Sequence, residues 1–196
     1  IFNKALQDPR RVLLPESHDV RVVKDASILA REQVVKPVLL GNLADVSAVA
    51  KEAEVSLEGI EVIQPDQDER YQSYVERYLE INKRRGATQA RARLEISQPD
   101  TFGMMMVREG DADGIVVGAT RPYAEAIRPA LSLIGSHGQA AGLHMVLTRD
   151  QTLFFADTTV NIDPDAETLA DLTLTAARTV RSFDIGPRVA MLSFAN

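Results

Sequence analysis

The chain has 196 residues, of which 45% are hydrophobic and 26% charged, and its formal net charge at pH 7 is −6. These values are typical of a globular chain and exclude disordered, collagen-like and membrane-embedded proteins as leading candidates. The acidic balance argues against nucleic acid or an anionic membrane as the main partner. Cysteine is absent. Its absence excludes disulfides, thiolate nucleophiles and cysteine-bound zinc, and it fits a reducing, cytoplasmic location.

The two ends of the sequence favour a piece of a longer protein. The chain starts at Ile1 rather than at a methionine, and no apolar signal-peptide region follows. No apolar run is long enough for a membrane-spanning helix. At the other end, the chain stops at Asn196, directly after an apolar run at 188–194 that we expect to be a buried strand.

Apolar runs and helical periodicity alternate from the start of the chain. We expect a strand at 11–15 and a helix at 19–33, then a strand at 37–41 and a helix at 42–54 capped by Asn42, then a strand at 59–63. The segment 68–85 is the clearest helix, because apolar side chains form one stripe and Gly86 follows its basic last turn.

The next elements are shorter. Thr88 is expected to cap a helix that reaches Ile96, and Asp100 or Thr101 to cap another that places Met104–Met106 in the core. A fourth buried strand is expected at 113–118, followed by a helix at 123–134 that contains Pro129. Runs at 142–148 and 152–157 predict a hairpin added to an otherwise parallel sheet. Asp163 and Pro164 are expected to start a helix that ends at Arg181, before the strand at 188–194.

This order of elements predicts an α/β fold with a mainly parallel sheet and helices on both faces. We expect residues 1–135 to form a first α/β lobe. Residues 136–196, with the hairpin, a helix and a strand, are expected to belong partly to a second lobe.

In open α/β sheets, ligands bind beyond the carboxyl ends of the strands. Polar clusters follow four predicted strands, and we expect them on one edge: 16–19, 118–121 with Arg128, 157–159, and Asn196. Gly118, Thr120 and Arg121 have the chemistry of an anion site, because a glycine turn exposes backbone N–H groups and a guanidinium binds phosphate oxygens. The alternative is ordinary turn and capping residues, with Arg121 and Arg128 on a solvated face.

Other polar residues are weaker candidates. His18, His137 and His144 are not at metal-ligand spacing, so no metal site is predicted. Glu16 next to Ser17 and His18 fits either a catalytic role or helix capping near Ser17 or Asp19. Lys83–Arg85 fits a helix C-terminus or a pyrophosphate contact. Neither GxGxxG nor GxxxxGK[ST] occurs, so dinucleotide binding in that mode and P-loop chemistry have no support.

Several ordered motifs resemble the phosphate acetyltransferase (phosphotransacetylase) family: 102–118, 120–123 and 127–130. The runs at 152–164 and 187–194 are more similar to the phosphotransacetylase-like C-terminal domain of bacterial hybrid NADP-dependent malic enzymes. The resemblance covers 11–196. It implies a two-lobed fold, incomplete at the C-terminus of this chain, that binds CoA or acetyl-CoA in a cleft and forms a homo-oligomer. Neither nucleic acid nor a membrane is an implied partner.

The resemblance also implies site residues. In active members the CoA thiol attacks the acetyl carbon of acetyl phosphate, arginines hold the phosphate, and a downstream aspartate is the base. Arg128 matches a phosphate-binding arginine, and Gly118 and Thr120 line the same loop. Arg121, which matches only the malic-enzyme-like loop, and Asn196 complete the expected acetyl-CoA or phosphate site.

Two departures from the active enzymes weigh against turnover. Asn82 stands where active members carry a second arginine, and the region of the catalytic aspartate lies beyond Asn196. We therefore expect no catalytic residue in this segment. The leading hypothesis is a regulatory and oligomerisation domain that senses acetyl-CoA, with malate oxidation, NADP and a divalent metal confined to an N-terminal part of the protein. The alternatives are a fragment of an active phosphate acetyltransferase and a structural assembly domain with a vestigial pocket.

Overall fold

The computed structural model describes residues 2–135 and 139–192. The chain divides into two compact units, Ile1–Gly135 and Ser136–Asn196. Each helix among the described residues is too short or too polar to span a bilayer.

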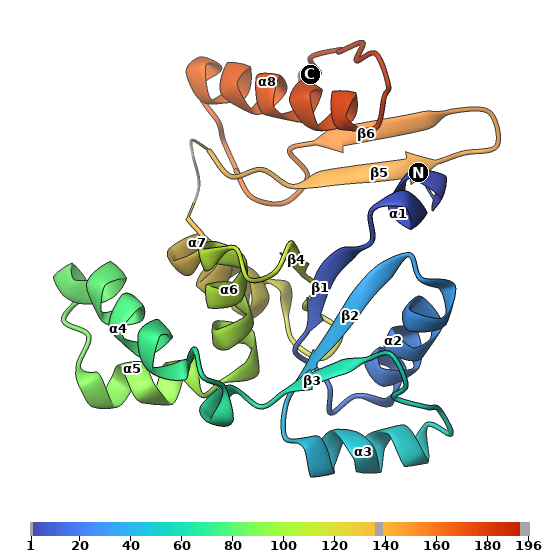
Figure 1. The fold of residues 1–196 in the computed structure, drawn as a ribbon. Coiled ribbons are helices and arrows are strands. Elements are labelled where there is room, and N and C mark those ends of the chain that lie inside the picture. The colour runs from blue at the N-terminus through green and yellow to red at the C-terminus, as the bar shows by residue number, and fades with distance from the viewer. Residues whose placement is uncertain (1, 136–138, 193–196) are drawn as a thin grey trace. The chain divides into compact units, whose positions relative to one another are not determined.

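The first unit is built on a four-stranded parallel sheet with the strand order β3-β2-β1-β4 (Figure 1). After the short helix α1 (Phe2–Gln7), the strands are β1 (Arg10–Leu14), β2 (Val35–Leu40), β3 (Glu61–Ile63) and β4 (Gly114–Ile115). Leu13 pairs with Val38 of β2 and with Ile115 of β4, so β1 is an inner strand. The predicted parallel α/β architecture is confirmed for this unit.

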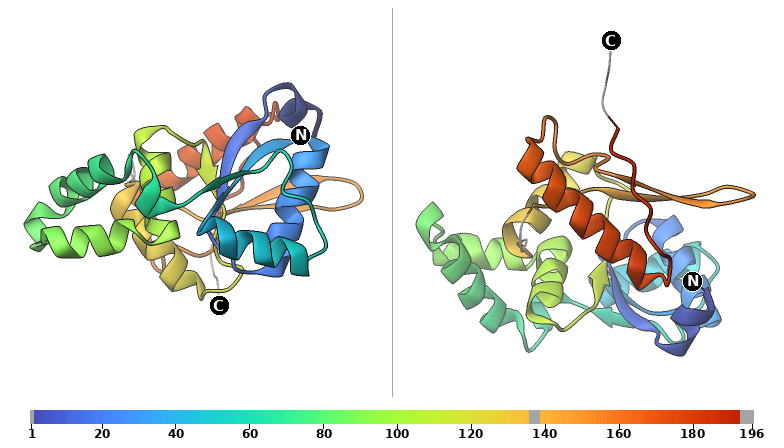
Figure 2. Two further views of the ribbon diagram at one scale, coloured as in Figure 1. Left: turned by 60° about the horizontal axis from the view of Figure 1, so that its bottom comes forward. Right: turned by 90° about the horizontal axis from the view of Figure 1, so that it is seen from above.

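Helices cover both faces of this sheet (Figures 1 and 2). One face carries α2 (Val20–Glu32) and α3 (Leu43–Glu52). The other carries α6 (Pro99–Glu109) and α7 (Tyr123–Leu133), together with a helical hairpin of α4 (Tyr71–Asn82), the 3-10 turn η2 (Lys83–Arg85) and α5 (Gln89–Ile96). A second 3-10 turn, η1 (Pro65–Gln67), links β3 to α4.

The pleat of the strands divides the apolar side chains between two cores, because neighbouring residues of a strand point to opposite faces. Leu13 and Leu40 pack with α4–α7, whereas their neighbours Leu14 and Leu39 pack with α2 and α3. Strands buried on both faces are continuous apolar runs rather than alternating ones. This pattern explains why β1 and β2 were recognisable from the sequence.

Helix α6 makes the closest approach to the sheet. A Cβ atom at Gly103 would lie 2.8 Å from the Cδ1 atoms of both Leu40 and Ile115, so a larger residue would force these two side chains to move. Beside it, Phe102 is fully buried and packs against the ring of Tyr74, with ring centroids 5.1 Å apart. The predicted burial of Met104–Met106 in this core is confirmed.

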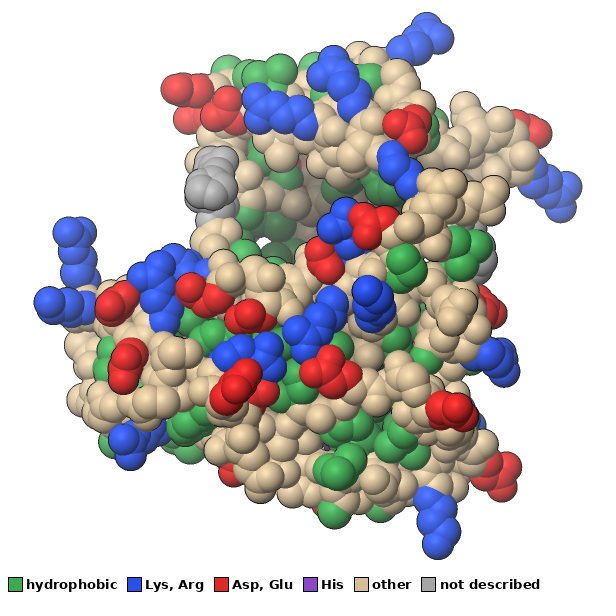
Figure 3. All heavy atoms as spheres, viewed as in Figure 1, with side chains coloured by type: hydrophobic (Ala, Val, Ile, Leu, Met, Phe, Trp, Pro, Cys, Tyr) green, Lys and Arg blue, Asp and Glu red, His purple; other side chains and the backbone are tan. Residues whose placement is uncertain are grey.

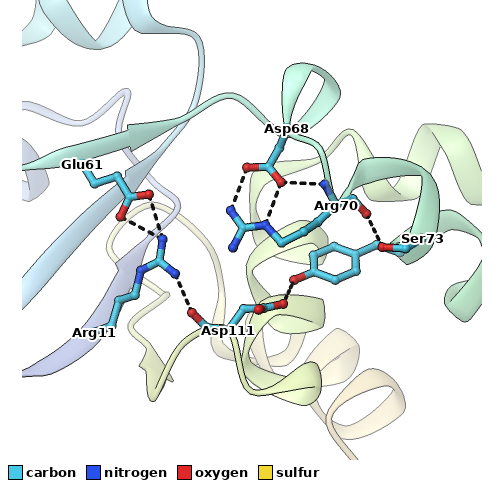
Figure 4. Close-up of polar contacts among 7 residues, drawn as sticks. Arg11, Glu61, Asp68, Arg70, Ser73 and Asp111 are labelled. Carbon is cyan, nitrogen blue, oxygen red and sulfur yellow. Dashed lines mark hydrogen bonds and ion pairs between the residues drawn. The ribbon is translucent and has the colours of Figure 1, made fainter.

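A polar network fastens α4 to the amino-terminal ends of the strands (Figure 4). Arg11, the second residue of β1, donates to both carboxylate oxygens of Glu61 at 2.8 Å and to the carbonyl of Asp111 at 2.7 Å. The hydroxyl of Tyr74 donates to the Asp111 carboxylate. Burial and this contact with Asp111 raise the pKa of Tyr74 well above its usual range, so the phenol stays protonated at neutral pH.

Asp68 and Arg70 extend this network at the start of α4 (Figure 4). The guanidinium of Arg70 donates to both oxygens of Asp68 at 2.7 Å, and the backbone N–H of Arg70 donates to the same carboxylate at 2.9 Å. The side-chain hydrogen bond from Arg70 is the main reason that the pKa of Asp68 lies below its usual value. Because Asp68 turns the chain in this way, α4 begins at Tyr71, three residues later than predicted.

Other boundaries in the first unit also differ from the predictions, by one or two residues in β1, β2, β3 and α3 and by more in the cases that follow. Helix α6 begins at Pro99 with Gln98 as its N-cap, not at Asp100 or Thr101, because the fixed φ of proline suits the first helical position. The last turn before Gly86 is the 3-10 turn η2 rather than α-helix. Strand β4 covers two residues instead of 113–118 and is only half-buried, since among the described residues it pairs with β1 alone.

Within residues 139–192, the second unit contains a two-stranded antiparallel sheet and one helix. Its elements are β5 (Leu143–Leu147), β6 (Thr152–Ala156) and α8 (Ala166–Ser182). The predicted hairpin is confirmed, but it forms a sheet of its own and is not added to the parallel sheet. It packs on α8 instead, and Phe154 of β6 meets Phe183, the residue that ends α8, at a ring-centroid distance of 5.7 Å.

Two further predictions in this unit are wrong. Helix α8 is capped by Asp165 rather than by Asp163, because the Asp165 carboxylate accepts the N–H of Thr168 at 2.8 Å. Residues 188–192 are irregular, since no strand among the described residues pairs with them. The rest of the predicted strand, 193–194, lies outside the described residues.

Candidate functional site

The candidate site lies at the carboxyl end of the parallel sheet, between β1 and β4. The chain leaves β1 toward β2 on one side and later returns to β4 on the other side. Such a reversal of strand order opens a crevice between the two loops that follow the neighbouring strands, which is where open α/β sheets bind ligands. Here these loops are 15–19 after β1 and 116–122 after β4.

The two loops are joined by the carboxylate of Glu16. The backbone N–H groups of Gly118 and Ala119 donate to Glu16 Oε2, each at 2.8 Å. The N–H of Thr120 donates to Glu16 Oε1 at 2.8 Å, and the Thr120 hydroxyl donates to the same oxygen at 2.6 Å. Gly118 has a φ of 110°, a conformation that glycine tolerates and that turns these N–H groups toward one point. We call residues 118–120 the amide cradle.

Glu16 is held as a charged, proton-free group. Its side chain is buried, which raises its pKa, but the hydrogen bonds from the Thr120 side chain and then from the three backbone N–H groups lower the pKa further, to about 2. A carboxylate with so low a pKa is a poor proton acceptor at neutral pH. The geometry therefore supports a holding role for Glu16 rather than the acid–base role left open from the sequence.

Ser17 and Asp19, which follow Glu16, form hydrogen bonds with the backbone of the first unit. The Ser17 hydroxyl donates to the carbonyl of Leu40 at 2.7 Å, and a Cβ atom at Gly41 would lie only 2.5 Å from this hydroxyl oxygen. Asp19 caps α2 by accepting the N–H of Arg21 at 2.8 Å, which agrees with the capping alternative. His18 is exposed. Among the described residues, no three acidic or histidine side chains gather closely enough to hold a metal ion.

The arginines of the second loop differ in their surroundings. Arg121 Nη1 lies 2.5 Å from Oδ2 of Asp100, a residue in the first turn of α6, and this ion pair is partly shielded from water. Arg128 lies on α7, is exposed, and makes no side-chain hydrogen bond or ion pair with any residue that the structure describes. Arg128 is therefore the free cation of the two.

Helix α7, which carries Arg128, is fixed at both ends. Its N-terminus follows the amide cradle directly. At its C-terminus, Arg108 of α6 donates to the carbonyls of Leu133 and Ile134. Cations at the last carbonyls of a helix stabilise it through both hydrogen bonding and the helix dipole. The helix continues through Pro129 up to Leu133.

Asn82, the first of the two departures from the pattern of active transferases, lies at the end of α4. Its side chain is buried and donates to the carbonyl of Tyr78 at 3.1 Å. Lys83, Arg84 and Arg85 follow it and are exposed. They form the turn η2 between α4 and α5, and Figure 3 shows basic side chains at the outer end of this helical hairpin.

The cluster predicted at 157–159 lies in the second unit. Asp157 belongs to the second unit, where its carboxylate accepts the N–H groups of Gly142 and Asn161 at 2.7 and 2.6 Å. Burial raises the pKa of Asp157, but hydrogen bonds from the Asn161 side chain and from backbone N–H groups, Gly142 first, bring it well below its usual range. Because β6 is not part of the parallel sheet, residues 157–159 do not follow one of its strands. Asn196 and His137 lie outside the described residues.

Comparison with known proteins identifies the fold family. A sequence profile of the phosphate acetyl/butaryl transferase family matches residues 1–196. The chain belongs to this family. It is 35% identical to a phosphate acetyltransferase of Nitratidesulfovibrio vulgaris over 198 residues, which cover all of this chain and 28% of that protein. It is 36% identical to an NADP-dependent malic enzyme of Escherichia coli over 203 residues, which cover all of this chain and 27% of the enzyme.

Solved structures of the family agree. A phosphotransacetylase from Staphylococcus aureus superimposes with a TM-score of 0.89 at 30% identity, covering 98% of this chain and 59% of that one. One from Streptococcus pyogenes gives 0.88 at 32% identity, covering 98% and 60%. The predicted family and fold class are thus confirmed. The chain spans less than two thirds of the length of each of these four relatives.

Proposed function

We propose that this phosphotransacetylase-like chain is an acyl-CoA-binding regulatory and oligomerisation domain of an NADP-dependent malic enzyme. Acetyl-CoA or CoA is its ligand, and a second copy of the same protein is its partner. Oxidative decarboxylation of malate to pyruvate, with NADP and a divalent metal, is carried by an N-terminal part of the protein. No nucleic acid and no membrane is involved, and the protein works in the cytoplasm.

The observation that carries this proposal is the environment of Asn82. Where the family pattern of active transferases has an arginine, the neutral amide is buried and its N–H is used by the carbonyl of Tyr78. The neighbouring cations Lys83 and Arg84 are exposed, and we propose that neither takes the place of a guanidinium at the Asn82 position. Transfer of an acetyl group from phosphate depends on several positive groups that converge on the developing charge. Loss of one of them favours ligand binding without turnover.

The proposed ligand contacts follow from the surroundings of the second loop. Arg128 is exposed and has no ion-pair partner in the part of the chain that the structure describes, and guanidinium groups bind phosphate oxygens through paired hydrogen bonds. Gly118 and Thr120 shape the loop beside it, and Arg121 is already paired with Asp100. We propose Arg128 as the main contact to a phosphate of acetyl-CoA, with Gly118, Thr120, Arg121 and Asn196 lining the site.

The second candidate function is a fragment of an active phosphate acetyltransferase. It is favoured by the similarity to transferases, since the relatives from N. vulgaris and Bacillus subtilis match at 35% identity, close to the 36% of the malic enzyme. The coding sequence upstream of Ile1 separates the two candidates. A preceding malic-enzyme and NADP-binding region supports the regulatory domain, and a start codon close by supports the transferase.

Regulation is testable in the full-length protein that contains this chain. We expect acetyl-CoA to bind and to change the rate of malate oxidation. By linkage, malate and NADP should change the affinity for acetyl-CoA by a factor of roughly 5 to 150, equivalent to about 1–3 kcal/mol. Calorimetry with and without malate and NADP measures this factor. Absence of acetyl-CoA binding would exclude regulation, and formation of acetyl-CoA from acetyl phosphate and CoA would support the transferase.

The two arginines of the site are separable by mutation in the same protein. Arg128→Ala removes a charge-assisted hydrogen bond worth roughly 1.5–3 kcal/mol, so we expect at least about tenfold weaker acetyl-CoA binding. The thermal midpoint should change little, because Arg128 is exposed and makes no ion pair with the described residues. Arg121→Ala, the matched control, should instead lower the midpoint by breaking the pair with Asp100. An unchanged affinity in Arg128→Ala would remove it from the ligand site.

A further inference from the structure

The amide cradle has the chemistry of an oxyanion-binding site. It offers four donors, three consecutive backbone N–H groups and the Thr120 hydroxyl, at 2.6–2.8 Å from the two oxygens of one carboxylate. Each carboxylate oxygen accepts two of them. Consecutive N–H groups that converge on one point are a recurrent way of binding anions in proteins.

No basic side chain among the described residues forms an ion pair with the anion in this cradle, and the guanidinium of Arg21, which donates to the carbonyl of Ala119, attracts it only at longer range. Glu16 is only 4% exposed, and it forms no ion pair with any residue that the structure describes. A buried carboxylate is tolerated only when other groups replace its water shell. Here the backbone N–H groups and one hydroxyl do so, which means that the cradle itself stabilises a full negative charge.

The cradle also connects two parts of the site. Glu16 follows β1, whereas the cradle links β4 to α7. On the other side of the loop, Arg21 donates to the carbonyl of Ala119 at 3.0 Å. The hydrogen bonds of Glu16 thus set the path of the chain into α7. They thereby also set the position of Arg128, which lies on α7 eight residues after Thr120.

We propose that residues 118–120 form an oxyanion-binding site whose resident anion is the Glu16 carboxylate, and that a free monocarboxylate takes this place when the Glu16 side chain is shortened. Glu16 is then a positioning residue for α7 and Arg128. The consequence for acetyl-CoA binding rests on the proposed function, whereas the anion site itself does not. Failure of the two is distinguishable, because the anion site is tested without any CoA ligand.

The test is chemical rescue in the full-length protein, read by hydrogen–deuterium exchange of a peptide that covers 116–122. In Glu16→Ala we expect the amides of the cradle to exchange on the order of tenfold faster than in the wild type at pH 7. Sodium acetate, titrated against sodium chloride at constant ionic strength, should restore their protection in a saturable manner. The wild type should not respond to acetate. A parallel titration with inorganic phosphate tells whether the cradle selects a planar carboxylate or accepts a tetrahedral anion.

Asp100→Ala is the matched control. It also removes a carboxylate that contacts the second loop, but its partner is the Arg121 side chain and not the backbone of the cradle. We expect the cradle of this variant to stay protected and to ignore acetate. If Glu16→Ala fails to fold, recovery of the folded protein by acetate at constant ionic strength supports the proposal, and lack of recovery by both acetate and phosphate overturns it. Unchanged exchange of 116–122 after loss of the carboxylate, or faster exchange without rescue by either anion, would overturn the proposal.

Discussion

Replacement of Phe102 by alanine is expected to lower the free energy of unfolding of the first unit by about 3–5 kcal/mol. The side chain is fully buried and packs on the ring of Tyr74 between α6 and α4. Removal of the ring loses the free energy gained by transferring it from water into the core. It also leaves a cavity, which the closely packed sheet cannot collapse to fill. At Gly103, which has no Cβ atom, α6 already lies close against Leu40 of β2 and Ile115 of β4. The helix therefore has little room to move toward the sheet and fill the cavity.

The unfolding of this unit can be followed on its own. The chain has no tryptophan, and its four tyrosines all lie within residues 71–123. Tyrosine fluorescence during urea unfolding therefore reports on the first unit. Leu94→Ala in α5 is the control, since this leucine is 64% exposed and its truncation should cost little. Equal losses of stability in the two variants would contradict the assignment of Phe102 to the centre of the core.

The second large effect concerns acid stability and Glu16. Because the pKa of Glu16 in the folded chain is about 2 against 4.5 for an ordinary glutamate, the folded state binds this proton less readily than the unfolded state. The stability from Glu16 is then fully present above about pH 4.5 and is lost as the pH falls through 2. The difference in pKa corresponds to about 3 kcal/mol at neutral pH.

Urea unfolding between pH 7 and pH 2.5 measures this contribution. At pH 7 we expect Glu16→Gln to be less stable than the wild type by about 3 kcal/mol, and the difference should shrink below pH 4.5. Glu58→Gln, which removes an exposed carboxylate from the same unit, is the control for the loss of one negative charge. A difference that stays constant over the whole pH range would show that the carboxylate of Glu16 is not the stabilising group.

Several features of the fold were predictable because their causes are local in the sequence. Strands buried on both faces are short apolar runs, so β1 and β2 stood out, and capping depends on one side chain and the next turn. Asn42 and Thr88 are indeed the N-caps of α3 and α5, and Gly86 ends the basic turn in a left-handed conformation. Where two caps competed, as at Asp163 and Asp165, the outcome depended on backbone geometry that the sequence does not specify.

The position of the candidate site was predictable from the sequence, but its hydrogen bonds were not. Polar residues after two neighbouring parallel strands must lie at the same edge, and Gly118, Thr120 and Arg121 do lie there with Glu16. That Glu16 fills the cradle was missed, although one sequence feature pointed to it: a lone glutamate directly after a buried strand, opposite a loop with glycine and threonine. Glu16 and its three backbone donors are separated by 102 to 104 positions in the sequence. They meet only because β1 and β4 are neighbours in the sheet.

The sequence by itself thus determined most of the elements, the family and the edge of the sheet at which the candidate residues 16 and 118–121 gather, because these follow from periodicity, turn chemistry and ordered motifs. The tertiary structure decided which charged side chains form hydrogen bonds or ion pairs with other described residues and which do not. It shows Glu16 bound by the cradle, Arg121 paired with Asp100, and Arg128 without a partner among the described residues. Charge pairing depends on distances of a few ångströms between distant segments, and such distances exist only once the sheet has brought those segments together.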